Sequence, residues 1–419
     1  MVRKTILIAL IALCGTRVAA GQTLVLDSIL GIIEKNNPEL KAYDSKITAY
    51  TAYATGAKAY EPPQLGAGFF MTPYNAGMWN EDLLAGSPGM GSFMISAQQM
   101  FTHPQKLRAS ARYMQSMANV DQEMSKAMRN ELYSMAKMNY YEWMILKKKL
   151  AVLKESEELL SYIIKSAEIR YTYGMDPLTA YYKAKAMLGD IKNMRLMIEY
   201  EIRQKRIALN TLMNRDKETL FDIDTVYAVK DYDLQPVDTS QIHNNRSDLK
   251  ALDQGIHLLT ARQNYERSKL KPDFGLKYDH MIAFGAQPQQ FSLMAMVTIP
   301  IAPWSSKMYK SSVKGLDLEI EAVKYQQQAL LNNTGGSLHS YKEQIKSKKQ
   351  QLELYDKSIV PSMKKNHQVT LIAYEQGKEE LYMVLDAWQN LKLVQLSRLD
   401  LLNELLQLQI SYEKELEIK

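Results

Sequence analysis

Cysteine and histidine are scarce in this chain of 419 residues, which has one cysteine, Cys14, and six histidines. No two histidines stand three or four positions apart, so the sequence does not show the spacing of a zinc site. The HExxH, GxSxG and P-loop patterns are also absent. We therefore expect no catalytic residue, no metal site, no cofactor and no enzyme activity.

A long apolar run is missing as well. Residues 1–20 combine Arg3 and Lys4, the short apolar segment TILIALIALC and the small residues of RVAA, which is the layout of a secretory signal peptide. A buried N-terminal helix and lipidation at Cys14 are the alternatives, although Leu13 is large for the position before a lipidated cysteine. After Ala20 no run approaches the ~20 apolar residues of a membrane helix.

Charge gives no indication of a nucleic-acid partner. The net charge is +6, and three basic residues but no acidic residue lie in the expected signal peptide, so the mature chain carries +3.

The mature chain contains two copies of one unit. NNPELKAYDSKITA at residues 36–49 resembles NNRSDLKALDQGIHL at residues 244–258, and IRYTYG ending at Gly174 resembles IAYEQG ending at Gly377. We therefore predict a signal peptide, two repeats and a mixed acidic connector between them. Their boundaries are residues 1–20, 21–215, 216–245 and 246–419.

Each repeat contains a pair of expected strands. Apolar and polar residues alternate in PDFGLKYDHMI and QFSLMAMVTIPI, which predicts strands with one apolar and one polar face. The weaker first pair carries glycines. The expected strands cover residues 63–71, 92–101, 272–282 and 290–301.

The expected helices are long. Residues 105–173 contain no glycine and no proline, and a helix of that length would extend about 100 Å. In the second repeat we expect breaks at NNTGG, residues 332–336, and at Pro361. The fold class is therefore mostly α, with a tandem repeat and long helices that pack as coiled coils.

Four strands cannot close a membrane barrel, and an open sheet edge leaves backbone groups unpaired in lipid. The sheet must therefore be completed by other copies of the chain. Two copies would give eight strands, whose interior is filled by side chains, whereas three copies would give a twelve-stranded β-barrel with room for a passage. The helices would continue this barrel as a second tube.

The opening LVLDSILGIIEKNNPELKA, the doubled strand pairs and the stretch from Tyr374 to Ala387 (YxxG…VLDA) resemble the TolC-type outer-membrane efflux proteins. The resemblance implies a homotrimer in outer-membrane lipid, with a twelve-stranded barrel and an α-helical barrel that reaches into the periplasm. It also implies a passive exit duct that receives substrates from an inner-membrane pump and a periplasmic adaptor. AQQMFTHPQKL, residues 97–107, is similar to the heavy-metal branch but has Gln105 where that branch has glycine.

The resemblance and the helix pattern together predict two kinds of site. Gly174 and Gly377 would form the periplasmic hairpin turns, where glycine tolerates the left-handed backbone of a helix end. Glu379, Met383 and Asp386 would share one helix face and form the pore constriction. Relatives often carry two acidic rings in this stretch; Asp386 matches one, and Met383 stands where the other is expected. A solvated surface aspartate is the alternative.

Other interpretations remain open. The 24 methionines include Met94, Met100, Met294 and Met296 on expected strands, and they either bind Cu(I) or fill gaps between elements. The chain could also be a periplasmic adaptor or a coiled-coil scaffold, although neither requires two pairs of alternating strands.

Overall fold

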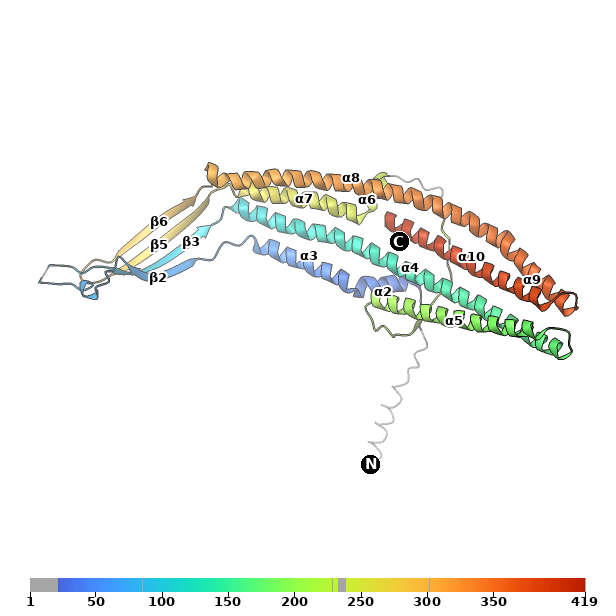
Figure 1. Cartoon of the computed structure of the whole chain (residues 1–419). Helices are drawn as coiled ribbons and strands as arrows, with labels where there is room; N and C mark the ends of the chain where they lie inside the picture. Colours follow the sequence, from blue (N-terminus) through green and yellow to red (C-terminus); the bar gives the residue numbers. More distant parts are fainter. Residues whose placement is uncertain (1–21, 85, 228, 233–238, 301, 419) are drawn as a thin grey trace, which may run out of the picture. The chain divides into compact units, whose positions relative to one another are not determined.

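The computed structural model describes residues 22–84, 86–227, 229–232, 239–300 and 302–418 (Figure 1). The expected signal peptide lies outside these residues. Two compact units divide the chain: one contains residues up to 41, 127–246 and 331–419, and the other contains residues 42–126 and 247–330. Helices α3 (Pro38–Gly56), α4 (Pro104–Thr172) and α8 (Pro303–Leu354) contribute to both units.

The second unit contains a four-stranded antiparallel sheet. Its order is β2 (Gln64–Phe70), β3 (Ser92–Phe101), β5 (Asp273–Ala283) and β6 (Gln290–Thr298), and the short 3-10 helix η1 (Ala76–Met78) lies between β2 and β3. The four expected strands are therefore present. The last one ends earlier than predicted, at Thr298. Pro300, which follows, has no N–H to donate to a neighbouring strand.

The sheet has one apolar and one polar face, because residues paired across an antiparallel ladder point to the same side. Phe274 pairs with Val297 and Tyr278 with Leu293, and all four side chains are exposed. On the other face Lys277 pairs with Met294. The alternation in the sequence is thus real. The apolar face is made by Leu65, Phe69, Phe93, Ile95, Phe101, Phe274, Leu276, Tyr278, Ile282, Phe291, Leu293 and Val297.

Helix α4 runs without interruption for 69 residues, as the absence of glycine and proline predicted. Helix α7 (Ser247–Ser268) lies beside it and ends just before β5. Tyr113 of α4 stacks on Tyr265 of α7, with ring centroids 6.2 Å apart. The long helices therefore continue directly from the strands.

The expected break at residues 332–336 is wrong. Helix α8 continues through NNTGG, where Thr334 is buried. Each glycine destabilises a helix by about 1 kcal/mol, which is small compared with the packing of a helix of 52 residues. Pro361 does not end the helix either. The π-helical turn η2 (Tyr355–Ile359) precedes it, and the Val360 N–H bonds to the Tyr355 carbonyl. Helix α9 (Val360–Glu375) then continues, because the wider turn accommodates the proline.

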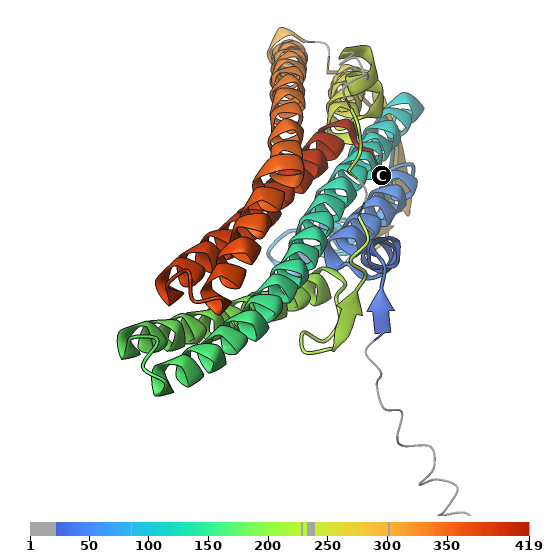
Figure 2. The same ribbon diagram turned by 90° about the vertical axis from the view of Figure 1, so that its right-hand side faces the viewer.

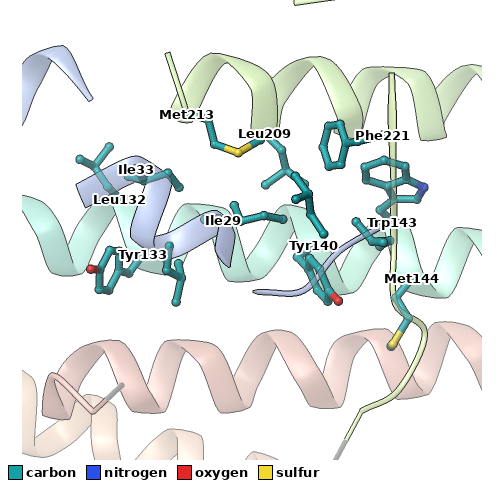
Figure 3. Packing of buried hydrophobic residues seen from close by; sticks show 14 of the residues in the cluster. Ile29, Ile33, Leu132, Tyr133, Tyr140, Trp143, Met144, Leu209, Met213 and Phe221 are labelled. Atoms are coloured by element: carbon teal, nitrogen blue, oxygen red, sulfur yellow. The ribbon is translucent and has the colours of Figure 1, made fainter. Parts of the chain in front are cut away.

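The first unit contains a compact core that sequence patterns did not predict (Figure 3). Strand β1 (Gln22–Leu24) pairs in parallel with β4 (Phe221–Ile223), which lies inside the expected connector. Phe221 packs edge to face on Trp143 of α4, with ring centroids 5.0 Å apart. Helix α2 (Leu26–Asn36) adds the fully buried Ile29 and Ile33.

A buried charge cluster also attaches the connector to the helices. Glu413 of α10 (Leu381–Leu416) accepts hydrogen bonds from Lys137, Lys230 and Tyr232, each at 2.6 Å. Burial alone would raise the pKa of Glu413, but these hydrogen bonds lower it below its ordinary value. The connector therefore carries folded structure, including β4 and helix α6 (Thr239–Asn245), rather than serving only as a link.

Among the described helices, none combines the length and the apolar character needed to cross a bilayer. The order of elements is the same in both halves of the chain: a helix, two antiparallel strands, a long helix, a turn and a returning helix. This order agrees with the internal repeat in the sequence.

Candidate functional site

Two helical hairpins of the first unit end in turns of the same geometry (Figure 1). Helix α4 turns into α5 (Leu178–Leu212) at Gly174, and α9 turns into α10 at Gly377. Their φ angles are +70° and +71°, where a side chain would be strained. In each turn the glycine N–H bonds three residues back and the next N–H bonds five residues back, which is a Schellman motif. The two expected turn glycines therefore do end helices.

The two hairpins pack side by side (Figure 2). A single buried cluster joins them and includes Leu160, Ile163, Ile191, Tyr374, Leu385 and Trp388. The fully buried Trp388 and Tyr374 are among the largest side chains in this cluster. Apolar packing thus holds the tips of the two repeats together.

The polar face of α10 matches the expectation only in part. Met383 and Asp386 are exposed, and Asn390 donates a hydrogen bond of 3.0 Å to Asp386. Leu385 and Trp388, on the other side of the helix, are buried. Glu379 does not belong to this face, because α10 begins only at Leu381 and Glu379 lies in the turn before it.

A buried polar network connects the hairpins. Tyr374, at the end of α9, donates a hydrogen bond of 2.5 Å to Asp176 Oδ2, and Arg170 Nε lies 3.1 Å from the same oxygen. The Arg170 guanidinium also lies over the Tyr374 ring, 4.6 Å from its centroid. Burial and the hydrogen bond to Asp176 raise the pKa of Tyr374 well above its ordinary value. The phenol therefore remains a donor at neutral pH.

This network was not found by sequence reasoning, although the repeat contains a signal for it. In the alignment of the repeats, Tyr171 corresponds to Tyr374 and Asp176 to Glu379. Each repeat thus carries a tyrosine and an acid around its turn glycine. Only Tyr374 and Asp176 meet, while Tyr171 is 44% exposed and Glu379 is exposed.

The polar face of the sheet brings methionines together with one ion pair. Lys277 Nζ lies 3.1 Å from Asp279 Oδ1, and Met94 pairs in register with Met281. Across the described residues, no cluster of three or more histidine, cysteine, aspartate or glutamate side chains could hold a metal ion.

Known structures share this fold. VceC of Vibrio cholerae superposes with a TM-score of 0.73 at 15% identity, over 93% of this chain and 95% of that chain. The outer membrane channel MtrE of Neisseria gonorrhoeae in its open state gives 0.72 at 14% identity, over 94% and 89%. CusC gives 0.75 at 15% identity, over 93% and 91%. Among curated protein sequences, none matches the chain significantly.

In the sequence itself, residues 29–215 match the model of the outer membrane efflux proteins. Over these residues, a little under half of the chain, the sequence is similar to this family. The match and the shared fold together support an exit duct of the outer membrane, which is a transport component and not an enzyme. The adaptor and scaffold alternatives do not agree with that match.

Proposed function

We propose that three copies of this efflux protein close their sheets into one twelve-stranded barrel. This proposal rests on the open edges of the sheet. Strands β2 and β6 each pair on one side only within the described residues, and the face that contains Phe291 and Leu293 is apolar and exposed. Unpaired edges are costly in lipid, so a chain with these strands requires neighbours.

The polar face of the sheet would then line the passage, and the helices would extend it into the periplasm. Near the hairpin turns, the exposed Asp386 of three chains would form a ring of carboxylates, with Met383 beside it. Like charges held close together attract cations. We assign the constriction of the duct to this ring.

The network of Arg170, Asp176 and Tyr374 would act as the tie that keeps the two hairpins together in the closed duct. A duct that opens at this end must move one hairpin relative to the other. Such a movement would break the buried hydrogen bond of Tyr374 to Asp176, which lies beside the turns.

The turns at Gly174 and Gly377 would face a periplasmic adaptor, which would in turn hold an inner-membrane pump that supplies the substrate. Exposed apolar side chains around the turns, including Tyr173, Met175 and Tyr382, support a protein contact there. Replacing either glycine by valine should impair export and leave insertion into the outer membrane intact.

The assembly is tested by native mass spectrometry of the protein purified in detergent, together with conductance in planar bilayers. A trimer that conducts ions supports the proposal. A detergent-solubilised monomer without channel activity contradicts it.

A further inference from the structure

A basic groove lies between α4 and α7, next to the end of β3 and the start of β5. It encloses about 830 Å³ and is lined by Arg108 and Arg112 from α4 and by His257, Arg267 and Lys271 from the α7 side. The remaining lining is polar or small and includes Gln105, Gln115, Ser116, Thr260 and Asn264. No acidic side chain of the described chain contributes to it.

The basic residues of the groove lack ionic partners. Among the ion pairs of the described residues, none involves Arg108, Arg112, Arg267 or Lys271. The two acidic residues nearest to them along the chain already form ion pairs with other lysines. Asp273 pairs with Lys106. Glu266 pairs with Lys269. Four exposed cationic side chains around one groove repel one another, so a bound anion would reduce this repulsion.

The geometry suits an anion with several oxygen atoms. Arg108 and Arg112 stand one helical turn apart on α4, while Arg267 lies in the last turn of α7 and Lys271 follows just after that helix. A second, smaller hollow of about 340 Å³ shares Arg108 and Arg112 and adds Lys58 from α3. Guanidinium groups bind phosphate oxygens in pairs, while the neighbouring amides and hydroxyls can bind the remaining oxygens.

We propose that this groove binds a phosphate-bearing anion. Gln105 lies four residues beyond the end of β3, and Lys271 lies two residues before the start of β5, so the groove begins where the strands end. The shared chemistry is a phosphate group, supplied either by a phospholipid headgroup at the membrane boundary or by a soluble polyphosphate. Neither source depends on which partners dock at the hairpin turns.

Two measurements on the purified full-length protein separate the sources. Isothermal titration calorimetry in non-ionic detergent measures the affinity for tripolyphosphate. Native mass spectrometry after exchange into equal amounts of phosphatidylglycerol and phosphatidylcholine counts the retained lipids. We expect the wild-type protein to bind at least one probe, and we expect Arg108→Gln and Arg267→Gln each to weaken that binding roughly tenfold or more.

Arg262→Gln is the matched control, since Arg262 is exposed on α7 but does not line the groove. It should change the affinity by about twofold at most. Binding of tripolyphosphate alone identifies a solute site, and selective retention of phosphatidylglycerol identifies a lipid site. Absence of binding to both probes, or equal losses for Arg262→Gln and Arg108→Gln, overturns the proposal.

Discussion

Tyr374→Phe is the smallest change that tests the tie between the hairpins. It removes one hydroxyl and leaves the ring, so the apolar packing around the fully buried Tyr374 is retained. The lost hydrogen bond of 2.5 Å ends on the carboxylate of Asp176, whose side chain is only 6% exposed. A hydrogen bond to a charged group contributes about 1.5–3 kcal/mol. The equilibrium between joined and separated hairpins should therefore shift about 10- to 150-fold toward separation.

The assay is single-channel recording of the purified protein in planar bilayers at neutral pH. We expect the variant to open more often, or to a higher conductance, than the wild-type protein. The ion pair of Arg170 with Asp176 remains in the variant, so the carboxylate keeps one partner and the fold should persist. Thermal unfolding of the two proteins checks this condition.

Tyr171→Phe is the matched control, because Tyr171 occupies the equivalent position of the first repeat and is 44% exposed. Its conductance should equal that of the wild-type protein. If Tyr374→Phe conducts like the wild type while unfolding normally, the hydrogen bond does not hold the hairpins together. If both variants open equally, the effect belongs to the tyrosines in general and the assigned tie is wrong.

Three further predictions address the sheet, the constriction and the connector. Val297→Arg on the apolar face should reduce trimer assembly in the membrane, because an arginine exposed to lipid near mid-membrane destabilises the barrel by about 2–4 kcal/mol. Thr298→Arg on the polar face should assemble, and the reverse result would show that the polar face is the one that contacts lipid. Asp386→Asn should lower cation selectivity and block by multivalent cations in planar bilayers, and unchanged values would place the constriction elsewhere. Glu413→Gln should lower the melting temperature at neutral pH. The pKa of Glu413 is lower in the folded protein than its ordinary value of 4.5, so its contribution to the free energy of unfolding is present above pH 4.5 and is lost as the pH falls through the folded pKa. The melting temperatures of variant and wild type should therefore converge in acid, and parallel pH profiles would contradict this.

The strands and the long helix α4 could be predicted because each follows a local pattern. Alternation marks a sheet with two different faces, and the absence of glycine and proline marks an uninterrupted helix. The same local reasoning was wrong at residues 332–336 and at Pro361. At residues 332–336 the two glycines destabilise the helix only slightly compared with the packing of a long helix. At Pro361 a π-helical turn accommodates the proline.

The parallel pair β1 and β4 could not be predicted, because three residues carry no period and the partners are far apart in the sequence. The same holds for the contact of Asp176 with Tyr374, which are 198 positions apart. The repeat identified a tyrosine and an acid at both turns. It could not indicate which of them meet, since that depends on how the hairpins pack. Glu379 was misplaced for a related reason, because the pattern on α10 does not show where the helix begins.

The two turns differ in whether their tyrosine and acidic residue are buried, and this difference affects how strongly each could hold the proposed duct closed. An exposed pair such as Tyr171 and Glu379 would contribute little even if it formed, because water competes for both groups. The buried contact of Tyr374 with Asp176 therefore contributes more than such an exposed pair would to the energy that holds the hairpins together near the turns. At about 1.5–3 kcal/mol it would favour the joined hairpins about 10- to 150-fold. It is also weak enough that a partner with about 150-fold higher affinity for the separated state would offset it. In the proposed duct, a tie of this size would allow docking at the turns to open the passage without unfolding the packed apolar cluster around Trp388.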